Sequence, residues 1–461
     1  MPFLPSQHAP DRLGIAPAAR LTAGRLLALA AAVSLALVHY KVDSDGLLRY
    51  RWLLTLLDEG RSTGMIYSSL MPLASAPFLL LDRFLGLDGA LFTRFNLGLF
   101  LAGLAFLHRR LCRPLGEEAA LNMVLLLLCG SMFTNLVNNY FGEVFTAVLV
   151  CAGLVLVHQG SPLAGWALAV LGAANTPAVL AGLGLSALHA AWLRRDWRHL
   201  LAPAGAALLM AAEVWLRNGG LATGYEGNAG IKTFMPYSGL PGFSYPFALG
   251  LLSILFSFGK GLLFFVPGLF FRPRPVRGFD PAPLWTAMVL FVAGEALVYA
   301  KWWAWYGGLC WGPRFFLFAC FPAALALGTA LAAPGASGGG SADPTPWRTA
   351  MTALATAFSV WVALSGVVFG DRAVQSICWF NNYAFEVLCW YAPEYSTLFT
   401  PFVFKLDPLP YGWWLIALFG ATGLYLLAPL VRDATPRVVR ALRETLAGAR
   451  RGGPDGAGDG S

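Results

Sequence analysis

Two acidic residues lie close together in Asp43-Ser44-Asp45-Gly46, directly after the first long apolar run of the chain. Tyr50 follows roughly one helical turn further on. A partly desolvated carboxylate beside a helix start can accept a proton from a hydroxyl group or bind a divalent cation. Asp43 and Asp45 are therefore candidates for catalysis and for a metal site. The alternative is that Asp45 only caps the following helix.

A third acidic candidate, Glu143, comes after the segment 138–142 at a predicted turn between two apolar runs. An ionisable residue at the edge of an apolar region is costly unless it is paired or used. Hydration at a membrane surface lowers that cost, so a purely structural role for Glu143 stays open. Glu213 and Glu295 lie deeper within apolar runs and are candidates for buried partners of basic residues.

Three cations, Lys260, Lys301 and Arg314, lie outside the arginine clusters that are expected at the cytoplasmic ends of the apolar runs. The planar fork of Arg and the compact charge of Lys both suit phosphate oxygens, so together these residues could bind a lipid phosphate or pyrophosphate. The alternative is that their long side chains reach towards lipid headgroups. Trp311 belongs to an aromatic group at 302–311, which is also typical of an interfacial aromatic belt.

The elements that carry these residues are predicted from composition. Of the 461 residues, 57% are hydrophobic and 12% charged, against roughly 25% charged in an ordinary soluble domain. Apolar runs of about 20 residues, long enough to cross the bilayer, recur along the chain. We therefore predict an all-α integral membrane protein with about twelve transmembrane helices. The predicted spans are 21–40, 93–111, 118–136, 143–158, 161–174, 177–193, 199–216, 260–271, 284–300, 315–333, 349–369 and 411–431.

Arginine clusters at alternate connections predict the orientation, because Lys and Arg collect on the cytoplasmic side. The clusters are Arg12 and Arg20, then 109–113, 194–198 and 272–277, and finally 432–451. Both termini are then cytoplasmic, and the candidate residues face outward. Since these anchors account for most of the net charge of +8, we do not interpret it as nucleic-acid binding.

The predicted organisation follows from these spans, with function expected in the long outer loops. Within the first loop, Gly46–Glu59 and Met71–Leu85 are expected to be helices lying at the membrane surface. Cys378 and Cys389 share an outer loop, where they could form a disulfide or stay as free thiols. The segments are a cytoplasmic N-terminus (1–20), a transmembrane catalytic module (21–332) with its first outer loop (41–92), a cytoplasmic linker (333–348), C-terminal spans (349–431) with an outer loop (370–410), and a cytoplasmic tail (432–461).

The sequence resembles a known family, the polytopic glycosyltransferases of the GT-C superfamily, which use polyprenyl-phosphate sugars as donors. The fold implied is similar to that of the protein mannosyltransferases and aminoarabinose transferases. The resemblance covers roughly residues 20 to 330. The matching blocks, in order, are Ser44-Asp45-Gly46 with Tyr50, then Pro72 through Phe78, Arg94-Phe95-Asn96, Glu143, Phe258 through Leu262 with Pro267, and Gly307-Gly308 followed by Trp311-Gly312-Pro313-Arg314.

This resemblance implies a metal-optional inverting sugar transfer, in which a divalent cation can take part and a first-loop Asp activates or positions the acceptor. Asp45, Asp43 and Glu143 would be catalytic, and the substrate-binding residues would be Tyr50, Lys260, Lys301, Trp311 and Arg314. The implied setting is a bacterial inner membrane with the active face in the periplasm, and the partners are a polyprenyl-phosphate sugar, membrane lipid and a glycan, lipid or protein acceptor. Two departures are the Glu at 143, where many relatives have Asp, and the loop 370–410, which matches no motif. A transporter or flippase, and a noncatalytic scaffold of this fold, are the competing interpretations.

Overall fold

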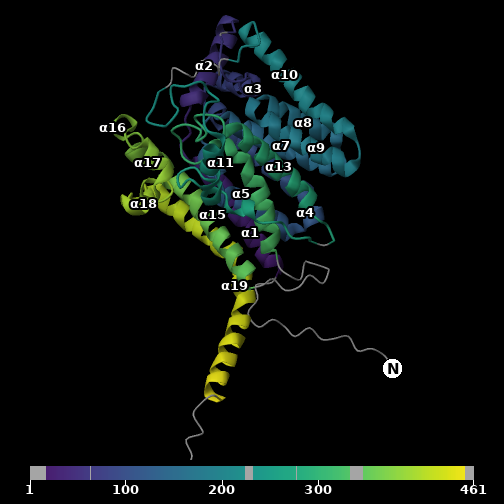
Figure 1. Ribbon diagram of the computed structural model, residues 1–461, viewed down its shortest axis with the longest axis vertical. Coiled ribbons are helices and arrows are strands. Elements are labelled where there is room, and N and C mark those ends of the chain that lie inside the picture. The colour runs from purple at the N-terminus through teal and green to yellow at the C-terminus, as the bar shows by residue number, and fades with distance from the viewer. Residues whose placement is uncertain (1–16, 63, 224–231, 277, 333–345, 452–461) are drawn as a thin grey trace, which may run out of the picture.

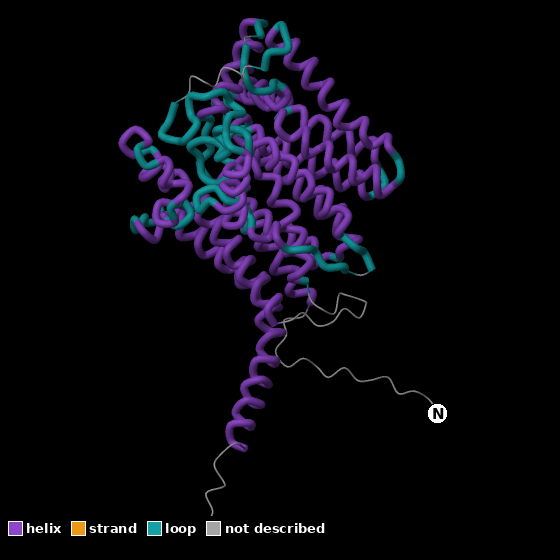
Figure 2. The backbone as a smooth tube through the Cα atoms, viewed as in Figure 1, coloured by secondary structure: helices purple, strands orange, loops and turns teal. Residues whose placement is uncertain are grey.

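The computed structural model describes residues 17–62, 64–223, 232–276, 278–332 and 346–451, and in the last range the side chains as far as 432. Within these residues the chain forms helices joined by turns and loops, with no β-strand (Figures 1 and 2). The predicted all-α class is confirmed. Most of the predicted linker 333–348 and the end of the predicted tail lie outside the described residues.

The helices follow the predicted apolar runs closely along most of the chain. Their bounds are α1 Pro17–Leu37, α2 Ser44–Glu59, α3 Leu70–Leu85, α4 Phe95–Leu115, α5 Glu117–Cys129, α6 Phe133–Leu136, α7 Gly142–His158, α8 Pro162–Ala174, α9 Leu180–Arg194, α10 Leu201–Asn218, α11 Phe247–Phe256, α12 Leu262–Phe265, α13 Ala282–Tyr299, α14 Cys320–Leu331, α15 Pro346–Ala373, α16 Phe380–Tyr383, α17 Glu386–Tyr391, α18 Thr400–Val403 and α19 Pro410–Arg451. Short 3₁₀ turns precede several of them, including η6 at Arg314–Ala319.

Six of the described helical segments are long and apolar enough to cross a membrane, and the chain is a multi-pass membrane protein. They are Ala18–Leu37, Trp197–Asn218, Ala282–Tyr299, Arg314–Leu331, Pro346–Cys378 and Pro410–Arg432. Three further apolar helices, α7, α8 and α11, are shorter. The predicted number of about twelve spans is therefore not confirmed.

The prediction is wrong around residues 247–271. The predicted span 260–271 is not one helix, because it consists of α12 and a separate 3₁₀ turn at Pro267–Phe270. Pro267 lacks a backbone N–H and so cannot continue α12. The apolar helix of this region is α11, which lies between the predicted spans 199–216 and 260–271. The predicted boundary between the spans 161–174 and 177–193 is present, since α8 ends at Ala174 and a new turn begins at Pro177.

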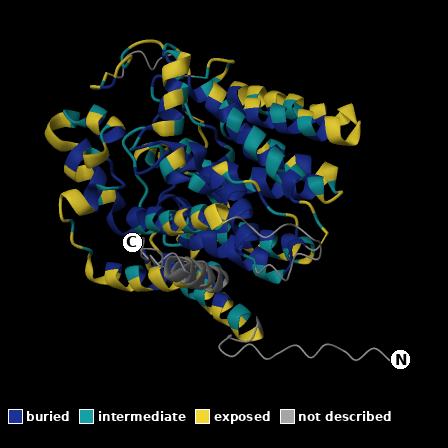
Figure 3. Ribbon diagram, turned by 60° about the horizontal axis from the view of Figure 1, so that its bottom comes forward, coloured by how far each residue is buried: buried dark blue, intermediate teal, exposed yellow. Residues whose placement is uncertain are grey.

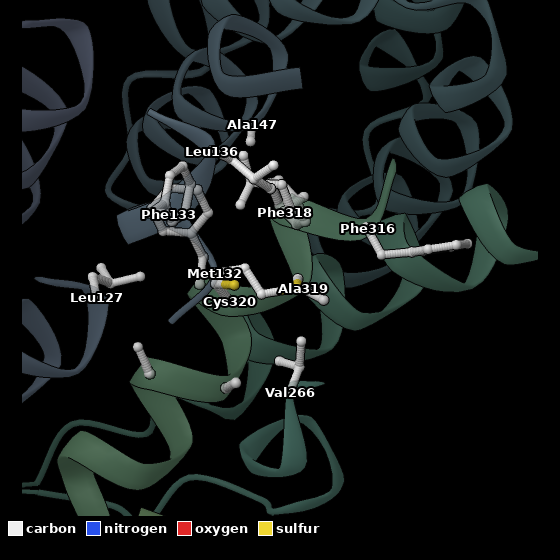
Figure 4. Packing of buried hydrophobic residues seen from close by; sticks show 14 of the residues in the cluster. Leu127, Met132, Phe133, Leu136, Ala147, Val266, Phe316, Phe318, Ala319 and Cys320 are labelled. Carbon is white, nitrogen blue, oxygen red and sulfur yellow. The ribbon is translucent and has the colours of Figure 1, made fainter. Parts of the chain in front are cut away.

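The core lies where α5, α6, α7 and α14 meet. Phe133 of α6 stacks on Phe100 of α4, with ring centroids 4.4 Å apart, and lies 5.3 Å from Phe321 of α14. Figure 4 shows Phe133, Leu136 and Phe318 close to one another in this core. Most of α14 is buried inside the protein, whereas α1 is largely exposed, and exposed residues concentrate on the outer helices (Figure 3). The outer helices therefore present the apolar surface that the bilayer covers.

The first predicted loop forms a helical cap at one end of the bundle, where Figure 1 places α2 and α3 beside the end of α10. The N–H and hydroxyl of Ser69, before α3, donate to the Glu213 carboxylate of α10 at 2.8 and 2.7 Å. Arg217 donates to the same carboxylate at 2.8 Å. Glu213 is thus a buried partner of a basic residue, as predicted. Helices are present at both positions expected within the first loop, as α2 and α3.

Candidate functional site

A cavity of about 880 Å³ opens where the starts of α2 and α7 meet the segment between α13 and α14. Asp45 comes from α2, Glu143 from α7 and Arg314 from the start of η6. Asp45 and Glu143, two acidic candidates from separate segments of the sequence, therefore line one cavity. Besides these three, the walls include Arg49, Tyr67, Asn175, Thr176, Thr233, Phe243, Ser244, Tyr299, Trp302, Trp303, Tyr306, Phe315 and Glu386.

Arg314 joins the two acidic positions. Its Nη2 donates to Oδ2 of Asp45 at 2.6 Å, and its Nε lies 3.6 Å from Oε1 of Glu143. The side chains of Arg314, Asp45 and Glu143 are 10%, 19% and 11% exposed, so this pairing is largely desolvated. Neither Nε of Arg314 nor Oε2 of Glu143 makes a hydrogen bond. The cluster therefore keeps one donor and one acceptor available for a ligand.

The two neighbouring aspartates at the start of α2 have different surroundings. Asp43 occupies the N-cap position of α2, accepts from the Asn139 amide at 2.6 Å and pairs with Lys41 at 3.2 Å. It does not line the cavity, whereas Asp45 does. Burial alone would raise the pKa of Asp45, but Arg314, Arg49 and a Tyr67 hydrogen bond together bring that pKa below its ordinary value. Asp45 is thus held as a carboxylate.

Arg49, one turn after Asp45 on α2, is a site residue that the sequence analysis missed. It is 5% exposed, and its guanidinium lies 4.3 Å from the ring centroid of Tyr67. Its Nε and Nη1 have no hydrogen-bond partner. A Cβ at Gly142 would come within 2.9 Å of Nη2 of Arg49, so only glycine leaves room there for the guanidinium. The cavity therefore contains a buried cation with free donors.

Lys260 supports the turn that leads to Arg314. Its ammonium donates to the carbonyls of Gly308, Cys310 and Gly312 at 3.1, 2.6 and 2.8 Å, and lies 4.5 Å from the ring centroid of Trp390. An ammonium has three donors, and all three are used here. Lys260 does not line the cavity. The structure therefore places it behind the site, where it fixes the backbone that carries Arg314.

The other predicted binding residues also lie outside the cavity walls. Tyr50 packs against Phe92 with ring centroids 5.0 Å apart, and Lys301 is exposed. Trp311 is buried in the core, 5.3 Å from Phe265. Trp302, from the same aromatic group, does line the cavity. The sequence pattern located the aromatic segment but not which of its side chains face inward.

A second missed residue, Glu386, comes from α17 in the loop that matched no motif. It is fully buried and lines the cavity, and neither of its carboxylate oxygens makes a hydrogen bond of normal geometry. The hydroxyls of Thr233 and Tyr306 face it, and burial raises its pKa above the ordinary value. The disulfide between Cys378 and Cys389 anchors α17, which resolves the alternative left open for these thiols.

The predicted metal role of Asp43 and Asp45 finds no cluster in the described part of the chain. No group of three or more His, Cys, Asp or Glu side chains there could hold a metal ion. The two aspartates are paired separately, with Lys41 and Arg314. Each carboxylate already has a cationic partner, with which a divalent ion would have to compete.

Comparison with known proteins finds similarity to solved structures. No protein-family model and no curated protein matches the chain. Two solved structures of ArnT from Cupriavidus metallidurans are similar to it, one bound to undecaprenyl phosphate and one in the apo state, at 15% and 16% sequence identity. Each has a TM-score of 0.48, and the match covers 90% of this chain and 78% of that chain. Similarity of this degree assigns neither a family nor an activity.

Proposed function

We propose that the protein is a membrane glycosyltransferase that moves a sugar from a polyprenyl-phosphate donor to an acceptor hydroxyl on the non-cytoplasmic face of a bacterial inner membrane. One observation carries the proposal. Two buried guanidinium groups with unused donors, Arg49 and Arg314, face the same cavity as Asp45 and Glu143. Such buried donors suit a phosphate, since a guanidinium group can donate two parallel hydrogen bonds to phosphate oxygens.

In this reaction the carboxylates and the guanidinium groups of the cavity act on different atoms. The acceptor hydroxyl attacks the anomeric carbon of the sugar, and its proton passes to Asp45 or Glu143. The bond from that carbon to the phosphate oxygen breaks, and the electron pair leaves with the polyprenyl phosphate. Negative charge then grows on the phosphate, where Arg314 and Arg49 stabilise the transition state more than the ground state.

The rest of the cavity suits a lipid-linked sugar. Its walls carry Phe243, Tyr299, Trp302 and Phe315, which offer apolar and aromatic surface to a prenyl chain or a sugar ring. Water is largely excluded from the ion pairs, so each charge acts more strongly than it would in solution. A transporter is the alternative, for which two halves with matching interrupted helices would be expected. The sequence has no evident internal repeat.

Binding of undecaprenyl phosphate to the purified full-length protein tests the phosphate site directly. We expect binding by the wild type and a loss of roughly tenfold or more for Arg314→Gln, because a charge-assisted contact is removed. Turnover is measured by the release of undecaprenyl phosphate from undecaprenyl-phosphate sugars in reconstituted membranes. Binding without turnover for any donor tested would favour a transporter or a noncatalytic scaffold.

The orientation is tested with single added cysteines. Leu48→Cys is expected to react with an impermeant thiol reagent in intact cells, and Asp196→Cys is not, because the arginine clusters put residue 196 in the cytoplasm. The parent protein without an added cysteine gives the background from native thiols. Labelling at 196 and not at 48 would reverse the proposed orientation and move the cavity to the cytoplasmic face.

A further inference from the structure

A second cavity, of about 690 Å³, lies at the other end of α7 from the site described above. Glu143 is in the first turn of this helix and His158 in its last, and α7 has 17 residues. A helix of that length spans roughly 25 Å, close to the thickness of the hydrocarbon core. The two cavities are thus separated by nearly the depth of a membrane.

This second cavity, called the basic pocket below, is strongly cationic. Its lining includes Arg109, Arg110 and Arg113, together with Gln159, Phe279 and Leu284. The lining contains no carboxylate. Asp280, beside Phe279 in the chain, uses its carboxylate to accept from the Ala282 N–H at 2.9 Å.

The three arginines of the basic pocket differ from other arginines nearby. Arg20 pairs with Glu118 and Arg25 with Glu117, next to the start of α5. By contrast, no carboxylate pairs with Arg109, Arg110 or Arg113 anywhere in the part of the chain that the structure describes. Charges gathered around one hollow without counter-ions repel one another, and an anion would relieve that repulsion.

The geometry of the pocket is set by the ends of two helices. The Gln159 side chain donates to the backbone carbonyl of Arg110 at 2.8 Å, which ties the end of α7 to α4. Phe279 and Leu284, before and within α13, supply an apolar wall. The hollow is therefore basic on one side and apolar on the other, and it is much larger than a single phosphate ion.

We infer that the basic pocket binds the headgroup of an anionic phospholipid. The phosphodiester would accept from the arginine forks, while the glycerol and upper acyl chains lie against Phe279 and Leu284. Basic pockets between membrane helices bind anionic headgroups in this way. This inference is independent of the proposed function, because none of its residues lines the larger cavity.

The test compares two double variants that remove the same charge. Arg109→Gln/Arg113→Gln changes the basic pocket, and Arg195→Gln/Arg198→Gln changes exposed arginines of another predicted cytoplasmic cluster, outside the pocket. All four positions are exposed, so both variants are expected to fold, which circular dichroism checks. Bound lipid is counted by native mass spectrometry of purified full-length protein with added phosphatidylglycerol, phosphatidylcholine or inorganic phosphate.

We expect the wild type to retain phosphatidylglycerol in preference to phosphatidylcholine. The pocket variant should lose that affinity by roughly tenfold or more, since two arginines that attract the anionic headgroup are removed, and the control variant should keep it. Equal losses in the two variants would mean diffuse attraction to basic surface and would reject the site. Equal retention of the two lipids, or displacement of the lipid by inorganic phosphate at the same concentration, would also reject the assignment.

Discussion

The guanidinium of Arg314 donates to the carboxylate of Asp45 at 2.6 Å, although 269 positions separate them in the sequence. A residue proposed to hold the donor's phosphate and one proposed to address the acceptor are therefore in direct contact. This contact explains how Asp45 remains charged in a largely buried place. It also means that replacing either residue affects the other, so substitutions must be chosen to separate their roles.

Arg314→Lys keeps the positive charge but loses the planar fork, and Asp45→Asn keeps the shape but cannot accept a proton. We expect Arg314→Lys to lower both the affinity for undecaprenyl phosphate and turnover, by roughly tenfold or more. Asp45→Asn should leave that affinity nearly unchanged and lower turnover, by roughly a hundredfold where Asp45 is the residue that accepts the proton. Titration with undecaprenyl phosphate and turnover of a polyprenyl-phosphate sugar measure the two effects. Unchanged turnover in both variants would contradict the assignment.

Glu143→Gln tests which carboxylate accepts the proton. Oε2 of Glu143 has no hydrogen-bond partner, whereas Asp45 is already bonded to Arg314. If Glu143 is the acceptor, Glu143→Gln should reduce turnover by roughly a hundredfold, as general-base removal does. Glu394→Gln is the control, because Glu394 is exposed and outside the cavity. Full turnover in Glu143→Gln would assign the proton to Asp45 instead.

Much of the helical framework could be predicted from the sequence because apolar runs and proline breaks are local signals. The break before Pro177 and the two helices of the first loop are examples. The prediction for the region 247–271 is wrong, because Gly259 and Gly261 lie in the interruption between α11 and α12. Each packs against backbone so closely that a Cβ would clash, at 2.0 Å from the Cys389 carbonyl oxygen and 2.4 Å from that of Ser257.

Only some residues of the candidate site could be predicted from the sequence, because only some of them stand out by their local sequence context. Asp45, Glu143 and Arg314 stand near breaks between apolar runs, where a charge is conspicuous. Arg49 lies in a helix two positions from Arg51, and nothing in the sequence distinguishes the buried arginine from the exposed one. Lys260 was expected to bind phosphate, but a sequence does not reveal that backbone carbonyls already use all its donors.

The comparison of Arg49 with Arg51 also provides a sharp test. Arg49→Gln removes the buried guanidinium that faces the cavity, so the affinity for undecaprenyl phosphate should fall by roughly tenfold or more. Arg51→Gln removes the same charge from the exposed face of α2 and should leave affinity unchanged. Isothermal titration with both variants checks this. Equal losses would indicate a general electrostatic effect of helix α2 rather than a contact with phosphate.

The disulfide gives a prediction about stability. Cys378 and Cys389 close a short loop that positions α17, with its Glu386, against the cavity. Replacing both cysteines with serine should lower the free energy of unfolding by about 3 kcal/mol, because the unfolded chain regains the entropy of the open loop. Thermal unfolding of the double variant measures the loss. The matched control is Cys112→Ser, a free and partly exposed thiol. Equal midpoints for the two variants would contradict a stabilising bond.

Glu386 gives a pH-dependent prediction whose sign follows from its raised pKa. The folded protein holds the proton of Glu386 more tightly than the unfolded chain does, so stability falls as the pH rises through the folded-state pKa. Glu386→Gln carries a neutral amide at every pH and avoids that loss. We therefore expect Glu386→Gln to unfold at a higher temperature than the wild type at pH 7, and the difference to shrink towards pH 4. Thermal unfolding across this range, with Glu394→Gln as the exposed control, measures it. A difference that does not change with pH would show that Glu386 does not titrate in this way.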